Sequence, residues 1–286
     1  MNNFIKYLPV FGLVSCVFAP VSFAEHSTWV GNPLSAKGLV LVLHGLNLKP
    51  SKMKPLAEAV CNAETQMACL IVTLPGHEES GPSQMSSVGA EKLKSAVLLE
   101  VATIGTHARG RPVHLLGFSL GSLAGAWAIQ NLKTTDSRVP FRSAVLLAPP
   151  IETKSFARAA VLIPGPASWM IPSKNHVEYR ANSGTSLGAY RALYRLQDEL
   201  RDGDQSALNI PTLVFFNPRD ELVSASKLKK RVTESKWTHW SLEEVGPLET
   251  TLKPAYDHLF IDEPSMGKQQ WEKMKSRMLA FFASQR

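Results

Sequence analysis

The sequence predicts an α/β fold: a mostly parallel sheet covered by helices on both faces, with a helical cap inserted over one edge. Short apolar runs alternate with longer segments of helical periodicity along most of the 286 residues, as in sheets whose strands are buried on both faces. A G-x-S-x-G turn at residues 117–121 lies between one such run and a helical segment. The alternation stops between residues 149 and 209, which locates the insertion.

The predicted elements follow one another in a regular order. Apolar runs of strand length occupy residues 38–43, 68–74, 111–116, 143–148, 212–216 and 237–245. Helical patterns occupy residues 55–62, 84–107, 122–129, 186–201 and 266–282. Short buried strands separated by longer helices are typical of βαβ units, and the chain length suits one domain with an insertion.

Residues 1–24 have the composition of a signal peptide. Lys6 supplies a positive charge, residues 7–18 are apolar, and a small-x-small site at residues 22–24 precedes Glu25. The apolar run is too short and too interrupted by proline for a good membrane span. We therefore expect export to the periplasm or the medium. The alternative is a membrane-anchored lipoprotein acylated at Cys16, which follows a Leu-Val-Ser sequence.

Two cysteines remain after export, Cys61 and Cys69. In an oxidising compartment they would close a short loop between a helix end and the next strand, while the alternative is two buried thiols. No Cys/His cluster has the spacing of metal ligands, so no metal site is expected.

The insertion is predicted to be a cap, which divides the chain into core residues 25–149, cap residues 150–209 and core residues 210–286. It contains an apolar patch that includes Trp169, Met170 and Ile171, and a helix with periodic leucines and tyrosines. It contains no convincing strand. Its aromatic and periodic apolar residues argue against a disordered linker.

The formal charge of +7 is spread along the chain, and its densest group lies at residues 227–231. No aromatic platform or nucleic-acid-binding motif accompanies that group, so we expect no nucleic-acid partner. Peripheral association with an anionic membrane surface stays open.

The strand–turn–helix setting of Ser119 is that of a nucleophilic serine. Flanking glycines, Gly117 and Gly121, are needed where a Cβ would collide with the neighbouring strand and helix. A serine hydroxyl is a poor nucleophile until a base accepts its proton and a carboxylate orients that base. The chain should therefore supply an acid and then a histidine, each in a loop at a strand end.

Asp220 directly follows the strand at residues 212–216 and is the predicted acid, with Glu221 in reserve. Of the eight histidines, His258 lies in the loop between the last strand and the final helix, where a base could reach the serine. His239 belongs to the last strand and is expected to face away from the site.

Two backbone N–H groups are needed for the oxyanion of a tetrahedral intermediate. Leu120 supplies one at a helix N-terminus, where the helix dipole also favours negative charge. The other is expected from Leu46, because Gly45 after an early strand permits close approach.

In this order, the His44-Gly45 loop, the Ser119 turn, Asp220 and His258 resemble α/β-hydrolase-fold serine hydrolases. The capped branch with monoacylglycerol lipases, carboxylesterases and proline iminopeptidase-like peptidases is the most similar, over residues 36–284. The resemblance implies an eight-stranded, mostly parallel sheet. It makes Ser119 the nucleophile, His258 the base and Asp220 its orienter. The turn at residues 76–81 and the long loop before His258 depart from the family pattern.

The sequence thus predicts a serine hydrolase that cleaves carboxylic esters through an acyl-enzyme, without a cofactor. Apolar Trp169, Met170 and Ile171 favour a lipid-like or medium-chain acyl group. A serine aminopeptidase would instead need acidic groups to hold the substrate amine, and four carboxylates in the cap are available: Glu152, Glu178, Asp198 and Glu199. Acyl transfer to another alcohol, or a catalytically silent binding module, are the remaining alternatives.

Overall fold

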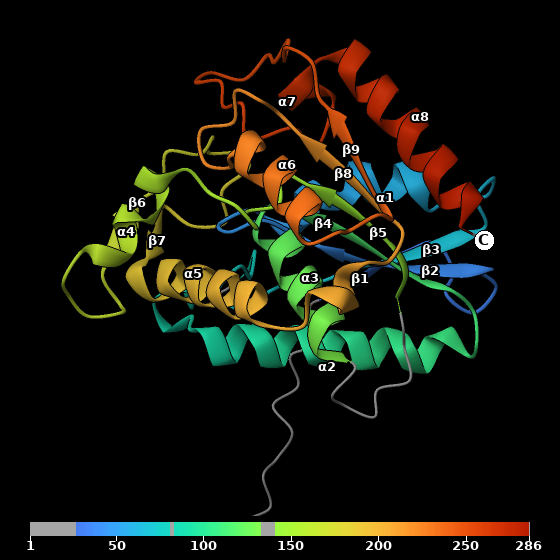
Figure 1. Ribbon diagram of the computed structural model, residues 1–286, viewed down its shortest axis with the longest axis horizontal. Helices are drawn as coiled ribbons and strands as arrows, with labels where there is room; N and C mark the ends of the chain where they lie inside the picture. Colours follow the sequence, from blue (N-terminus) through green and yellow to red (C-terminus); the bar gives the residue numbers. More distant parts are fainter. Residues whose placement is uncertain (1–26, 81–82, 133–140, 286) are drawn as a thin grey trace, which may run out of the picture.

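The computed structural model describes residues 27–80, 83–132 and 141–285. The predicted signal peptide and Cys16 lie outside these ranges. Within them a central sheet has the strand order β1-β3-β2-β4-β5-β8-β9 (Figure 1). The strands are β1 (Thr28–Val30), β2 (Gly38–Leu43), β3 (Met67–Ile71), β4 (Val113–Phe118), β5 (Phe141–Leu147), β8 (Thr212–Phe216) and β9 (Trp240–Glu244). Only β1 is antiparallel to its neighbour, so the predicted mostly parallel sheet is confirmed.

The sheet has seven strands in the described part of the chain, and the implied count of eight is wrong there. The difference lies at the β1 edge. Residues 27–37 contain one strand of three residues and a turn before β2 begins, which leaves space for a single antiparallel strand.

Helices cover both faces of the sheet, as predicted. One face packs against α2 (Ala90–Ala108), α3 (Leu120–Asn131), α5 (Leu187–Asp202) and α6 (Ala225–Glu234). The opposite face packs against α1 (Lys54–Val60), α7 (Glu263–Met266) and α8 (Lys268–Ser284). Helix α2 begins six residues later than predicted, because Met85–Ser87 forms a separate 3-10 turn, η3.

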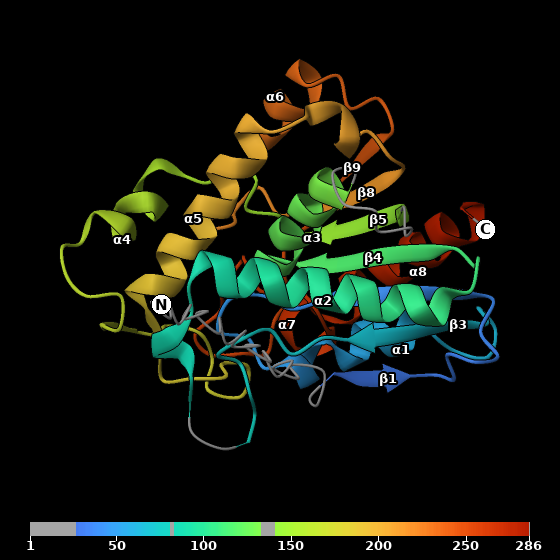
Figure 2. The same ribbon diagram turned by 90° about the horizontal axis from the view of Figure 1, so that it is seen from below.

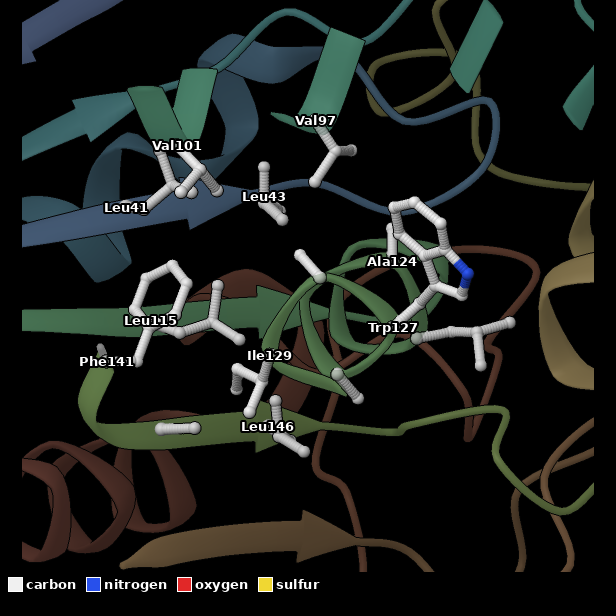
Figure 3. Packing of buried hydrophobic residues seen from close by; sticks show 14 of the residues in the cluster. Leu41, Leu43, Val97, Val101, Leu115, Ala124, Trp127, Ile129, Phe141 and Leu146 are labelled. Atoms are coloured by element: carbon white, nitrogen blue, oxygen red, sulfur yellow. The ribbon is translucent and has the colours of Figure 1, made fainter. Parts of the chain in front are cut away.

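Alternation along β2 divides the core into two layers. Leu39, Leu41 and Leu43 pack with the α2–α3 side, whereas Val40 and Val42 pack with the α1–α8 side. Successive side chains of a strand point to opposite faces, so an apolar run without polar interruptions is what a doubly covered strand requires. Figure 3 shows the first layer, where side chains of β2, β4 and β5 meet those of α2 and α3.

The insertion between β5 and β8 differs from the predicted all-helical cap. It contains η5 (Ser155–Arg158), α4 (Ala159–Leu162), β6 (Met170–Pro172), β7 (Gly184–Ser186), α5 and η6 (Gln205–Leu208). Strands β6 and β7 pair antiparallel, so the expectation of no strand is wrong. Strands of three residues are too short to leave a period-2 pattern in the sequence.

Helix α5 belongs to the body of the molecule. Its buried face, which includes Leu193, Leu196 and Leu200, lies in the same core layer as α2 and α3. The chain before α5, which includes α4, projects beyond the carboxyl ends of β4 and β5, together with the N-terminal end of α5 (Figure 2). Among the helices of the described ranges, none combines the length and apolar character needed to cross a membrane.

A disulfide joins Cys61, at the end of α1, to Cys69 in β3. The sequence left this pairing open. The bond ties a helix of the α1–α8 face to the sheet at a buried point.

Replacing both cysteines, Cys61→Ser with Cys69→Ser, is expected to lower the free energy of unfolding by about 2–3 kcal/mol. Without the disulfide the unfolded chain is no longer closed into a short loop, so its conformational entropy rises and the unfolded state is stabilised. Urea titration of both proteins measures the difference. A reductant should destabilise the wild type and leave the double variant unchanged; equal unfolding midpoints for the two proteins would contradict the expectation.

Candidate active site

Ser119 lies on a strained turn between β4 and α3. Its backbone has φ 48° and ψ −120°, a conformation that non-glycine residues rarely adopt and that clusters at functional sites. The Ser119 N–H donates to the Leu147 carbonyl at 2.8 Å, which anchors the turn to β5. The turn thus holds the hydroxyl at the carboxyl end of the sheet.

The flanking glycines are required by close packing. A Cβ on Gly121 would lie 2.1 Å from the Leu43 carbonyl oxygen, and one on Gly117 would lie 2.7 Å from the backbone of Ser122. Real Cβ atoms do not approach backbone so closely, so β2, β4 and α3 can meet around Ser119 only with glycine at both positions.

Ser119, His258 and Asp220 form one hydrogen-bonded chain. The Ser119 hydroxyl lies 2.8 Å from His258 Nε2, and His258 Nδ1 lies 2.7 Å from Asp220 Oδ2. Because the carboxylate only accepts, Nδ1 carries the proton of the neutral ring and Nε2 is left to accept the serine proton. The three side chains come from loops after β4, β8 and β9, and the structure brings them into this one hydrogen-bonded chain.

Asp220 is held as a charged acceptor. It is 1% exposed, and its Oδ1 accepts the N–H groups of Leu222 and Val223 at 2.7 and 2.9 Å. Burial opposes its charge, but His258 and these two N–H donors outweigh burial and lower the Asp220 pKa. For His258, burial likewise opposes the charged form, but the Asp220 carboxylate and then Glu221 raise the pKa above its ordinary value.

Glu221, held in reserve as the acid, has a different position. Its two carboxylate oxygens accept the backbone N–H groups of Asp257 and His258 at 2.9 and 3.0 Å. It therefore fixes the loop that carries the imidazole and does not contact the ring nitrogens. This role of Glu221 could not be predicted from a sequence pattern, because its hydrogen-bond partners are backbone groups 36 and 37 residues away.

The Gly45 loop lies against the serine turn. A Cβ on Gly45 would lie 2.9 Å from the Phe118 ring and 3.2 Å from Ser119 Cβ. Leu120 is the first residue of α3, where N–H groups have no intrahelical acceptor. Among the described residues the Leu46 N–H donates to no protein group. Leu46 and Leu120 thus lie on the two turns that meet at Ser119.

Other predicted positions lie away from this chain of hydrogen bonds. His239 is exposed in the turn that precedes β9, so its predicted place within the last strand is wrong. Trp169 and Met170 are 57% and 44% exposed, and Ile171, which pairs with Thr185 of β7, is half-buried. In the described ranges, no hydrogen bond or ring contact joins these three residues to Ser119 or His258. The same ranges hold no cluster of three His, Cys, Asp or Glu side chains suited to a metal ion.

Comparisons with known structures agree on the architecture. The lipolytic enzymes LipS and LipT, derived from a metagenome, give a structure similar to this chain with a TM-score of 0.68 at 18% identity, covering 90% of this chain and 97% of that one. Monoacylglycerol lipase from Paleococcus ferrophilus matches with a TM-score of 0.68 at 16% identity, covering 91% and 99%. A soluble variant of monoglyceride lipase from Saccharomyces cerevisiae matches with a TM-score of 0.70 at 12% identity, covering 91% of both chains.

Sequence comparison identifies the family. No curated protein matches the chain by sequence. The family described as "Alpha/beta hydrolase family" matches residues 39–265, which include the serine turn, the acid and the histidine. This match spans most of the chain and agrees with the fold. The chain belongs to the alpha/beta hydrolase family.

Proposed function

We propose that the protein is a serine hydrolase that cleaves carboxylic esters through an acyl-enzyme. The hydrogen-bonded chain from Ser119 through His258 to Asp220, with links of 2.8 and 2.7 Å, is the observation that carries this proposal. It supplies a nucleophile, a base in the accepting tautomer and a buried carboxylate that stabilises the imidazolium.

In the first half of the reaction, Ser119 Oγ attacks the ester carbonyl carbon while His258 Nε2 takes its proton. The carbonyl oxygen becomes an oxyanion, which the N–H groups of Leu46 and Leu120 stabilise. Collapse of the intermediate breaks the bond to the alkoxide, which receives the proton from His258. In the second half, His258 deprotonates water, and attack on the acyl-enzyme releases the acid and returns the proton to Ser119.

The proposed substrate is a lipid-like or medium-chain ester. Six apolar side chains of the insertion are at least 41% exposed: Phe156, Leu162, Ile163, Trp169, Met170 and Val177. Exposed apolar residues gathered on one segment favour apolar ligands, and two of the similar structures are named as monoacylglycerol or monoglyceride lipases.

The acyl preference is testable with p-nitrophenyl esters from acetyl to palmitoyl. We expect kcat/KM to rise about 10- to 100-fold from two to eight carbons, because each extra buried methylene contributes about 0.8 kcal/mol until the pocket is filled. Ser119→Ala gives the background rate. A preference for the acetyl ester would contradict the lipid-like substrate and leave esterase activity standing.

The aminopeptidase alternative has weaker support. Glu152 pairs with Arg231 at 2.9 Å, Asp198 with Arg158 at 2.6 Å, and Glu199 with Lys94 at 3.1 Å. These three carboxylates already have cationic partners, so a substrate amine would have to displace an arginine or lysine there; Glu178, the fourth carboxylate, is exposed. Acyl transfer to an added alcohol uses the same three side chains and is distinguished by product analysis with glycerol as acceptor.

We also propose that the chain is exported. The Cys61–Cys69 disulfide supports an oxidising compartment, since such bonds are rare in the reducing cytosol. Mass spectrometry of protein from the cell envelope or medium should find a mature chain that begins at Glu25. A chain acylated at Cys16 would support the lipoprotein route, and a full-length cytosolic protein would contradict export.

A further inference from the structure

Asn47 follows the Gly45–Leu46 turn directly and is locked in place by four hydrogen bonds. Its backbone has a φ of 55°, and its side chain is buried. Its N–H donates to His77 Nε2 at 2.7 Å, and its carbonyl accepts the N–H of Ala181 at 3.1 Å. Its side-chain amide accepts the Asn182 N–H at 2.8 Å and donates to the Asn182 carbonyl at 3.0 Å. An asparagine side chain that pairs with one residue's N–H and C=O mimics a strand partner, which fixes the position of that backbone.

His77 is in the tautomer that accepts the Asn47 N–H. His77 is fully buried, and its Nδ1 lies 3.0 Å from the Pro75 carbonyl, so Nδ1 carries the proton and Nε2 is the acceptor. Burial lowers the His77 pKa to about 4, despite the opposing backbone hydrogen bonds. The His44 ring packs against it in a tilted arrangement, with 4.6 Å between the ring centroids, and accepts the Leu74 N–H at Nε2. Two neutral imidazoles thus hold the Gly45–Leu46 turn and Asn47 in place.

The other partners of Asn47 come from the insertion, which is itself anchored. Asn182 Nδ2 donates to the Gly76 carbonyl at 2.8 Å, and the Lys49 N–H donates to the Tyr179 carbonyl at 2.8 Å. The buried Tyr179 hydroxyl lies 2.9 and 2.8 Å from the two carboxylate oxygens of Asp262, four residues after His258. Residues 179–182 therefore connect the Gly45–Leu46 turn to the segment that follows the imidazole.

We propose that Asn47 is a positioning residue for the proposed oxyanion hole. Residues 179–182 of the insertion hold Asn47 in position through their hydrogen bonds. The proposal rests on the proposed function. Asn47 contacts no reacting atom; it holds the preceding Leu46 N–H in the direction of the carbonyl oxygen. The insertion thereby also sets the geometry of the Gly45–Leu46 turn, although Asn182 is separated from Asn47 by more than 130 residues of chain.

The test variant is Asn47→Gly, since glycine adopts a φ of 55° without strain and the substitution removes only the side-chain pairing. We expect kcat on a p-nitrophenyl ester to fall about 10- to 100-fold with little change in KM, because a displaced donor weakens stabilisation of the transition state. The inhibition constant of a trifluoromethyl ketone, whose adduct with the serine carries an oxyanion, should rise by a similar factor. The pH at half-maximal kcat/KM should not move, because His258 and Asp220 are untouched.

Asn175→Ala is the matched control. It is an asparagine of the same insertion, and its side chain bonds, among the described residues, only to the adjacent His176 N–H. The control should stay within about twofold of wild type in kcat and in ketone affinity.

The outcomes separate the two claims. If wild type hydrolyses esters and Asn47→Gly retains full kcat, or loses kcat with unchanged ketone affinity, the positioning role is overturned while the proposed function stands. If wild type neither hydrolyses esters nor binds the ketone, the proposed function fails and this proposal with it. Should Asn47→Gly not fold, Asn47→Asp keeps the size and the acceptor but loses the donor to Asn182. The same parallel loss of kcat and ketone affinity is then expected, and unchanged values overturn the role.

Discussion

Ser119→Ala is expected to reduce kcat/KM for ester hydrolysis by a factor on the order of 10⁵ or more, which is typical when the nucleophile of such a chain of residues is removed. The hydroxyl at 2.8 Å from His258 Nε2 has no substitute, because Ser122, the next serine, donates to the Leu147 carbonyl from inside α3. Alanine adopts the same backbone region at a cost similar to that of serine, so the variant should fold. Initial rates with a p-nitrophenyl ester measure the effect, and circular dichroism checks the fold.

This result also separates an enzyme from a binding module on the same fold. A wild type that turns over and a serine variant that does not would exclude the silent module. Equal rates for the two folded proteins would contradict the proposed nucleophile.

Asp220→Asn is expected to lower kcat by about 10⁴-fold while leaving the shape of the loop intact. The asparagine oxygen can keep the two N–H bonds from Leu222 and Val223, but its NH₂ group would then face His258 Nδ1. That contact favours the tautomer with the proton on Nε2, which cannot accept the serine proton.

Steady-state kinetics measures the loss. Asp257→Asn is the control. The Asp257 carboxylate lies in the loop that carries His258, but it pairs with Arg219 at 3.4 Å and not with the imidazole. A loss below tenfold in Asp220→Asn would show that Asp220 does not orient the base.

The pH dependence follows from the direction of the His258 shift. The base must be neutral to accept a proton, and its pKa is raised because Asp220 and Glu221 stabilise the imidazolium more than burial disfavours it. Activity is therefore present above the raised pKa and lost as the pH falls through it, so half-maximal kcat/KM should lie above about pH 6.5. A profile from about pH 5 to 9 measures this value. A midpoint well below that value, or a flat profile, would contradict the assignment of His258 as the base.

The features that the sequence predicted are those that local chemistry dictates. Buried strands such as residues 38–43 must be apolar throughout, and a serine on a tight strand–helix turn needs Gly117 and Gly121. Catalytic loops must follow the carboxyl ends of parallel strands, and this requirement favours His258 among the histidines that follow Ser119 and limits the acid to Asp220 with Glu221 in reserve.

The features that could not be predicted from the sequence depend on contacts between a side chain and backbone groups far away along the chain. The Glu221 carboxylate accepts hydrogen bonds from the N–H groups of residues 257 and 258, and the Asn47 side chain pairs with the backbone of Asn182. Neither contact requires a particular residue type on the partner side, so the partner's sequence carries no signal. Strands β6 and β7 were missed for a related reason, because pairing between two three-residue segments leaves no periodicity.

The most direct test of the account is covalent labelling with a fluorophosphonate followed by peptide mass spectrometry. A serine whose proton is accepted by a positioned imidazole should react stoichiometrically. We expect the adduct on Ser119 alone, with labelling slowed about 10³-fold or more in His258→Ala. An unlabelled Ser119 in folded wild-type protein, or an adduct that forms equally fast without His258, would contradict the central claim.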